Sequence, residues 1–195
     1  MPGNPNQAAE PEAPSARAGR FTNSRWSGPR GLDAAAIVSV LNRHRVRYVV
    51  IGAFAAIAQQ APIAPTRDID LTPDISTANL RRLSAALKEL DARIRSDTVD
   101  GGLPFDHDGP SLGKAVIWNL ICGYGEFDIS FRPSGLDDGY TQLALNAHRV
   151  LVDGVEVVVA DLDDVIRSKE AAGRPKDIRV LPALYRYRAG RRGDT

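Results

Sequence analysis

The first half of the folded region alternates between apolar residues at helical spacing and short, continuous apolar runs. Residues 33–44 begin with an aspartate typical of a helix N-cap and repeat apolar residues every three or four positions, which predicts a helix. Residues 48–51 are continuously apolar and predict a buried strand that a glycine ends. We then expect an alanine-rich helix over residues 53–60, a proline-containing loop, a strand over 67–72 and a helix capped by Ser76.

The second half is rich in strand-like segments separated by turn residues, and it ends in helices. Glycine-containing turns between short apolar runs are typical of antiparallel hairpins. The expected elements are strands over 115–121 and 127–131, a helix over 137–147, a hairpin over 150–159 that turns at Asp153-Gly154, a helix over 161–172 ended by Gly173, and a last helix from Pro175. This order predicts an α/β (α+β) fold, in which a mixed sheet is flanked by helices and further helices lie at the C-terminus.

Composition agrees with one ordinary globular domain. The chain has 195 residues, 43% of them hydrophobic and 25% charged, which is enough apolar surface for a single core. Residues 1–30 are rich in Pro, Ala, Gly and Ser without a regular period, which predicts a flexible arm. We therefore expect a domain over residues 31–190 with a helical C-terminal part, followed by a short tail over 191–195.

Charge, apolar runs and cysteine content exclude several classes of protein. The 25 Lys and Arg residues exceed the 24 Asp and Glu residues by one, which excludes a histone-like polycation. No apolar run approaches the roughly 20 residues of a membrane helix, and the N-terminus lacks the apolar core of a secretory signal. The single cysteine excludes a disulfide framework. We expect a monomeric, cytoplasmic protein without membrane association.

Two aspartates on one predicted strand are the strongest chemical feature. Asp68 and Asp70 are two residues apart, so a strand places both side chains on one face, while Ile69 and Leu71 point to the other. Neighbouring carboxylates repel each other unless a cation lies between them, and carboxylate oxygens suit Mg²⁺ or Mn²⁺. Two ordinary acids on a solvent-facing edge strand are the alternative interpretation of this motif alone.

Two further features would complete a site for phosphate chemistry. Gly52 stands between a strand and a helix, where exposed N–H groups and the helix dipole favour an anion. Asp128 lies between apolar residues on a later strand. If that strand lies beside the strand of Asp68 and Asp70, the three carboxylates form a triad. Two metal ions held by such a triad would activate an attacking hydroxyl and stabilise the leaving phosphate.

In combination, these segments resemble a known superfamily. Residues 49–55 (Val-Val-Ile-Gly-Ala-Phe-Ala), residues 66–71 (Thr-Arg-Asp-Ile-Asp-Leu) and the isolated Asp128 are similar to the polymerase β-type nucleotidyltransferases. Together with Ser168-Lys169 and residues 173–177, they look like the minimal nucleotidyltransferase toxins of the abortive-infection type, the toxin halves of bacterial toxin–antitoxin pairs. The resemblance extends over about residues 32–185 and implies a polymerase β-like nucleotidyltransferase fold.

The resemblance implies a role for each matching residue. Asp68, Asp70 and Asp128 would be catalytic and bind the metal ions, and Lys169 would be catalytic through its contact with the triphosphate of the NTP co-substrate. The implied nucleotide-binding residues are Gly52, Ala53, Thr66, Arg67, Lys169, Arg174, Lys176 and Asp177. Thr66 would also be the residue that an antitoxin phosphorylates, since a phosphate there adds negative charge beside two carboxylates and should displace the nucleotide.

The acceptor expected from the resemblance is RNA, and in particular the 3′ end of tRNA, whose modification would block translation. A cognate antitoxin protein is the second expected partner. Independently of the resemblance, nine Lys or Arg residues lie between residues 165 and 193 against two acidic residues, and Tyr185 and Tyr187 could stack on bases. A solvated helical face explains the same charges. The alternatives are nucleotidylation of a protein side chain or small molecule, and a non-catalytic binding module on the same fold.

Overall fold

The computed structural model describes residues 31–193, and the predicted arm over residues 1–30 lies outside the described residues. The strands are β1 (Tyr48–Ile51), β2 (Asp68–Pro73), β3 (Arg93–Ile94), β4 (Ile117–Cys122), β5 (Gly125–Ser130), β6 (His148–Val152) and β7 (Val155–Val159). The helices are α1 (Ala34–Arg43), α2 (Gly52–Ala58), α3 (Thr77–Glu89), α4 (Gly109–Leu112), α5 (Tyr140–Ala144), α6 (Leu162–Ala172) and α7 (Pro175–Gly193).

The strands form one mixed sheet in the order β3-β4-β5-β2-β1-β7-β6. β1 pairs antiparallel with β2 and parallel with β7, and β2 pairs parallel with β5. Tight turns join β4 to β5 and β6 to β7 as antiparallel hairpins. The central strands are therefore β2 and β1, and the predicted mixed sheet with flanking helices is confirmed.

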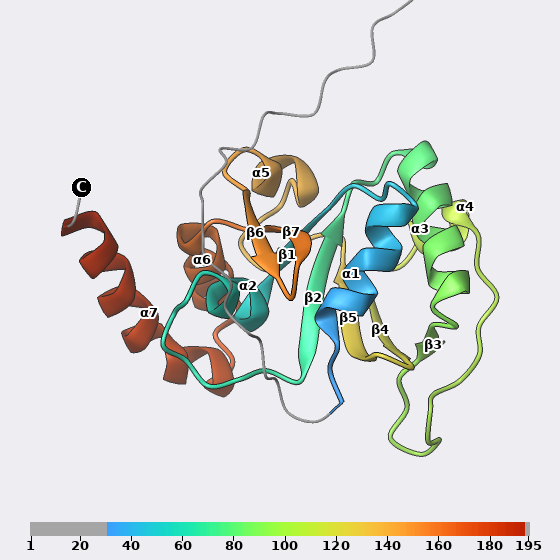
Figure 1. Cartoon of the computed structure of the whole chain (residues 1–195), viewed down its shortest axis with the longest axis horizontal. Coiled ribbons are helices and arrows are strands. Elements are labelled where there is room, and N and C mark those ends of the chain that lie inside the picture. Colours follow the sequence, from blue (N-terminus) through green and yellow to red (C-terminus); the bar gives the residue numbers. More distant parts are fainter. Residues whose placement is uncertain (1–30, 194–195) are drawn as a thin grey trace, which may run out of the picture.

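Helices cover the sheet from two sides. In Figure 1, α1, α3 and α4 lie to the right of the central strands, α2, α6 and α7 lie to the left, and α5 lies at the upper end. Every residue of β1 is buried, as expected for a strand between two helical layers. Ile37 and Leu41 of α1 and Leu83 and Leu87 of α3 are fully buried at the helical spacing seen in the sequence. Within residues 31–193, no helix combines the length and the apolar character that crossing a membrane would require.

Three elements differ from the sequence prediction. β3 and α4 were not predicted, because two strand residues and four helical residues are too short to establish a period. The helix predicted over residues 137–147 is limited to Tyr140–Ala144. Gly139, with φ +53°, and the turn before it prevent helical geometry at residues 137–139.

Helix ends confirm most of the predicted boundaries. α6 ends at Gly173, whose left-handed φ of +60° suits glycine, and α1 begins after Asp33, whose carboxylate accepts a hydrogen bond from the first turn. α3 begins after Ser76 as predicted, but the Ser76 side chain does not cap the helix. Its hydroxyl instead donates to Asp74 Oδ2 at 3.2 Å, so the position was correct and the capping bond was wrong.

Candidate active site

Strands β2 and β5 bring the predicted aspartates together. In their parallel register, Asp70 lies opposite Asp128 and Asp68 lies opposite Glu126. The residues between these acids on both strands are fully buried, whereas Asp68, Asp70 and Asp128 are partly exposed. Because side chains alternate along a strand, the acids share the face opposite the buried residues. The adjacency that the sequence analysis required for a carboxylate triad is therefore present.

The end of β1 adds Gly52 to this face. Ile51 pairs with Asp70, and Gly52 follows with a φ of +77°, a conformation that favours glycine. A Cβ at this position would lie 2.0 Å from Asp70 Oδ2. Only a residue without a side chain allows the start of α2, with Ala53 as its second residue, to approach the Asp70 carboxylate so closely.

Each carboxylate has its own near neighbours. Asp68 Oδ1 accepts a hydrogen bond from Thr66 Oγ1 at 2.6 Å. Asp128 Oδ1 lies 3.1 Å from Arg95 Nη2, and the same guanidinium lies 3.0 Å from Glu126 Oε2. With its amide oriented to donate, Asn119 Nδ2 on β4 also reaches both Asp128 oxygens at 3.2 Å.

Arg95 and Asn119 also belong to this site and were not predicted from the sequence. Arg95 follows the short strand β3, and its backbone N–H donates to the Asn119 carbonyl at 2.9 Å. Asn119 is placed opposite Asp128 by the β4–β5 register. The hairpin prediction contained a signal for Asn119, since cross-strand partners can be counted from the turn. Nothing in the sequence pattern indicated Arg95.

The site holds closely spaced negative charge. Burial raises the pKa of Asp70 to about 7, and the neighbouring charges of Asp68 and Asp128 add to this effect. The positive charges of Lys169 and Lys176 oppose this increase in the Asp70 pKa. Burial also raises the pKa of Asp128, although the Arg95 guanidinium opposes the increase. The cationic side chains therefore neutralise the cluster only in part.

The donor chemistry suits a divalent cation, although the side chains are not arranged to hold one as they stand. Among residues 31–193, no group of three or more His, Cys, Asp or Glu side chains is placed to hold a metal ion. The Asp70 carboxylate abuts Gly52, Asp68 accepts from Thr66, and Asp128 faces Arg95. Hard carboxylate oxygens with excess negative charge are nevertheless the ligands that Mg²⁺ and Mn²⁺ prefer. Cation binding would require Asp128 to exchange its contact with Arg95.

The junction of α6 and α7 contributes the predicted lysine. Lys169 is 9% exposed, and its Nζ lies 3.0 Å from Asp177 Oδ1, while Arg174 Nε lies 2.6 Å from Asp177 Oδ2. Burial favours a raised pKa for Asp177, but the hydrogen bonds from Arg174 and Lys169 outweigh it and the pKa is lowered. Asp177 therefore stays ionised and orients Lys169. Lys176 and Arg174 are exposed at the same junction.

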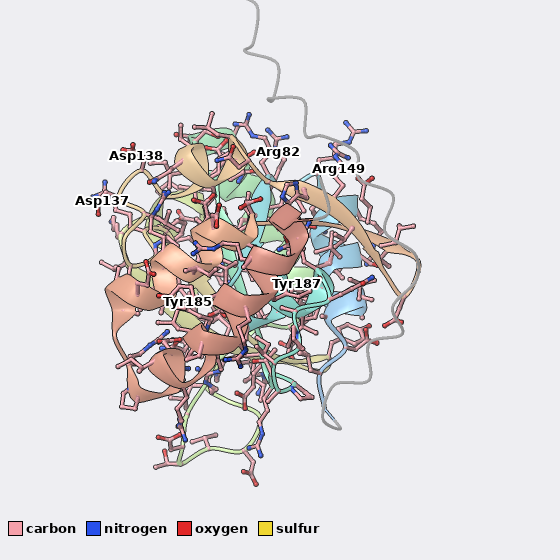
Figure 2. All side chains as sticks on the ribbon, turned by 90° about the vertical axis from the view of Figure 1, so that its left-hand side faces the viewer. Arg82, Asp137, Asp138, Arg149, Tyr185 and Tyr187 are labelled. Carbon is pink, nitrogen blue, oxygen red and sulfur yellow. The ribbon has the colours of Figure 1, made fainter. Side chains whose placement is uncertain are left out.

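Other predicted contacts have a different environment. Arg67 is exposed immediately before β2. Tyr185 and Tyr187 lie on α7, which packs beside α6 (Figure 2). Their hydroxyls donate to Glu170 Oε1 and to the Gln59 carbonyl, each at 2.5 Å. These bonds attach α7 to the domain, and stacking of the two rings on bases stays a prediction.

Comparisons with known proteins give a limited result. No family model matches this sequence, and no curated protein matches it. Among solved structures, the chain is similar to TM1012 of Thermotoga maritima, a candidate nucleotidyltransferase. The two share 18% sequence identity and a TM-score of 0.47, and the match covers 78% of this chain and 89% of that chain. It is also similar to ANT(2″)-Ia in complex with adenylyl-2″-tobramycin, with 16% identity and a TM-score of 0.45 over 76% of this chain and 83% of that chain. The solution structure of ANT(2″)-Ia, an antibiotic-resistance factor, is 14% identical to this chain and has a TM-score of 0.39. The match covers 81% of this chain and 91% of that chain. Similarities at this level assign no activity to this chain.

Proposed function

We propose that this chain is a nucleotidyltransferase, which moves the NMP group of an NTP to a hydroxyl and releases pyrophosphate. The observation that carries the proposal is the parallel pairing of β2 and β5, which sets Asp70 beside Asp128 with Asp68 on the same face. Gly52 brings the start of a helix against this cluster. Closely spaced acids with raised pKa values are costly to a fold and are typical of functional sites.

Each residue has a defined part in this chemistry. Asp68, Asp70 and Asp128 would hold Mg²⁺ or Mn²⁺, which would supply charge neutralisation at the phosphates and activation of the attacking hydroxyl. Lys169, oriented by Asp177, is available to the triphosphate as a fixed cation. The acceptor oxygen forms a bond to the α-phosphorus while the bond to pyrophosphate breaks. Asp128, whose pKa is raised by burial, is suited to receive the hydroxyl proton.

We further propose RNA, in particular the 3′ end of tRNA, as the acceptor. Exposed cations at the α6–α7 junction and before β2 suit a polyanion, and Arg95 adds a guanidinium beside Asp128. The same charges would repel a polycationic small molecule. Modification of tRNA ends would stop translation and make the protein a growth-inhibiting toxin.

An antitoxin that phosphorylates Thr66 would control such an activity. The Thr66 hydroxyl donates to Asp68 at 2.6 Å, so a phosphate there would replace a hydrogen bond by repulsion between like charges. The resulting charge would disfavour the nucleotide at the carboxylates. Growth inhibition by the wild-type chain that is lost in the phosphate-mimicking Thr66→Glu variant, but kept in Thr66→Ser, is the expected result.

A transfer assay tests the proposed reaction and acceptor. Purified protein is incubated with Mg²⁺, each α-labelled NTP in turn and total bacterial tRNA, with Asp68→Asn as the inactive variant and the exposed Asp137→Asn as its matched control. We expect label on tRNA for the wild type and for Asp137→Asn only. Label on protein would replace RNA by a protein acceptor, and absence of both label and NTP binding would leave a non-catalytic binding module.

A further inference from the structure

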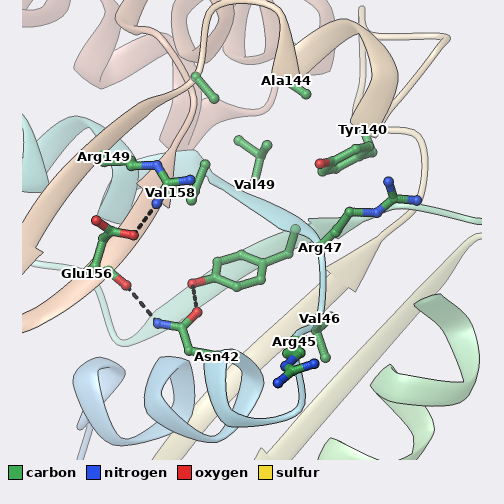
Figure 3. A pocket seen from close by; sticks show the side chains of 12 residues that line it. Asn42, Arg45, Val46, Arg47, Val49, Tyr140, Ala144, Arg149, Glu156 and Val158 are labelled. Atoms are coloured by element: carbon green, nitrogen blue, oxygen red, sulfur yellow. Dashed lines mark hydrogen bonds and ion pairs between the residues drawn. The ribbon is translucent and has the colours of Figure 1, made fainter. Parts of the chain in front are cut away.

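A cavity lies at the end of the central strands away from the carboxylates. Ile51 pairs with Asp70 at one end of the β1–β2 ladder, whereas Tyr48 pairs with Pro73 at the other, about 10 Å away at the rise of a strand. The cavity has a volume of about 510 Å³ and opens between the end of α1, helix α5 and the β6–β7 hairpin (Figure 3). This volume lies within the range of small-molecule sites in proteins.

The inner wall of the cavity is apolar. Val49, Val158 and Ala144 come from β1, β7 and α5 and face the same space (Figure 3). The Tyr140 ring forms one side wall. Val49 is 1% exposed, so the wall is continuous with the core and has a fixed shape. An apolar group of aryl size would bury these surfaces on binding.

The acceptors of Glu156 and Asn42, which line the cavity, already have partners. The Glu156 carboxylate forms an ion pair with Arg149. The Glu156 carbonyl accepts from Asn42 Nδ2 at 2.9 Å, and Asn42 Oδ1 accepts from the Tyr48 hydroxyl at 2.9 Å (Figure 3). A ligand that brings only donors would therefore compete with these bonds for Glu156 and Asn42.

Several donors are not used. Arg47 Nε is buried without a hydrogen-bond partner, although the end of the same guanidinium pairs with Asp74. Arg45 is exposed, and its guanidinium has no ion-pair partner among the described residues. The Tyr140 hydroxyl points into the cavity and makes no hydrogen bond to another described residue (Figure 3). Among the arginines that line the space, Arg47 pairs with Asp74 and Arg149 pairs with Glu156, which leaves the charge of Arg45 uncompensated.

We propose that this cavity binds a small amphiphilic anion, a carboxylate or phosphate monoester attached to an apolar body of about aryl size. The anionic group supplies the negative charge and the acceptors that the exposed Arg45 guanidinium and the Tyr140 hydroxyl lack. The apolar body covers the wall formed by Val49, Val158 and Ala144. The site is separate from the carboxylate cluster and does not depend on the proposed nucleotidyl transfer.

Phenyl phosphate serves as the probe in an NMR titration of the ¹⁵N-labelled full chain. Inorganic phosphate and phenol, which each carry half of the chemistry, are the controls, and benzoate replaces the phosphate by a carboxylate. We expect shifts of the amides of residues 45–49 and 140–147, with binding at least about tenfold tighter than either half alone. The tighter of phenyl phosphate and benzoate identifies the headgroup.

Two variants test the individual donors. Arg45→Asn removes the guanidinium and tolerates the positive φ of +53° at this position, and Tyr140→Phe removes only a hydroxyl. Arg179→Gln removes an exposed arginine on α7 as the matched control. We expect phenyl phosphate to bind more weakly to both variants, about tenfold for Arg45→Asn, and to bind Arg179→Gln as it binds the wild type. Equal affinity in wild type, Arg45→Asn and Tyr140→Phe, or shifts confined to the carboxylate cluster, would overturn the proposal.

Discussion

Replacing Asp70 by asparagine is expected to stabilise the fold while it removes the proposed activity. Burial and two neighbouring carboxylates raise the Asp70 pKa from 3.8 to about 7. The folded chain therefore holds this proton more tightly than the unfolded chain over that range. The contribution of Asp70 to stability is largest below pH 4, decreases as the pH rises to about 7, and stays at its low value above. Asparagine has the same shape and carries no charge, so it avoids this loss.

The size of the effect follows from the pKa difference. A difference of roughly 3 pKa units corresponds to about 4 kcal/mol as an upper limit, at 1.36 kcal/mol for each unit. Asp70 is partly exposed, and solvent screening reduces the value to the order of 2 kcal/mol. This is large for a single polar substitution, since most changes at surface positions stay within about 0.5 kcal/mol.

Urea unfolding followed by circular dichroism measures the effect between pH 4 and pH 8. The advantage of Asp70→Asn over the wild type should grow up to about pH 7 and then level off, and the exposed Asp137→Asn control should show no such trend. Adding Mg²⁺ at pH 8 should stabilise the wild type and not Asp70→Asn, because only the wild type gains a ligand. An Asp70→Asn variant less stable than the wild type at pH 8, or a stability difference independent of pH, would show that burial of the Asp70 charge does not destabilise the fold.

Three further substitutions test other parts of the site. Gly52→Ala sets a Cβ 2.0 Å from Asp70 Oδ2 at a φ of +77°. We therefore expect an inactive variant whose free energy of unfolding, measured by thermal unfolding, is lower by about 1–3 kcal/mol. Wild-type stability and activity in this variant would contradict the close approach. Asp177→Asn leaves the buried Lys169 ammonium without its carboxylate, and urea unfolding should show a loss on the order of 3 kcal/mol at pH 7. Because the Asp177 pKa is lowered, this difference should shrink as the pH falls below about 4, and a pH-independent difference would contradict the ion pair. Arg95→Ala removes the guanidinium that pairs with Asp128, so the affinity of the protein for Mn²⁺ should rise several-fold. Electron paramagnetic resonance measures this affinity, and an unchanged value would show that Arg95 does not compete with a cation.

Local patterns were enough to predict most elements and the face on which each acid lies. Alternation around Ile69 determined that Asp68 and Asp70 share a face, and the structure agrees. Leucine spacing predicted the buried face of α3, and Gly173 predicted the end of α6. These features depend on a few neighbouring residues, so the sequence determines them directly.

The remaining features depend on contacts between distant segments. The parallel pairing of Asp70 with Asp128 joins strands almost sixty residues apart, and the sequence analysis could state it only as a condition. Arg95 reaches Asp128 because β3, two residues long, pairs with β4 at the edge of the sheet. Such a short strand leaves no periodic signal, so its partner and the position of Arg95 follow from the assembled sheet alone.

Nucleotidyl transfer is distinguished from other phosphate chemistry by comparing two labels on the same nucleotide. Reactions with NTP labelled at the α-phosphate and, separately, at the γ-phosphate are run with Mg²⁺ and tRNA, for wild type and for Asp128→Asn. We expect the wild type to transfer the α-label to the RNA and to release the γ-label as pyrophosphate, and Asp128→Asn to do neither. Transfer of the γ-label would identify a phosphotransferase instead, and α-label transfer by Asp128→Asn at the wild-type rate would contradict the assigned carboxylate site.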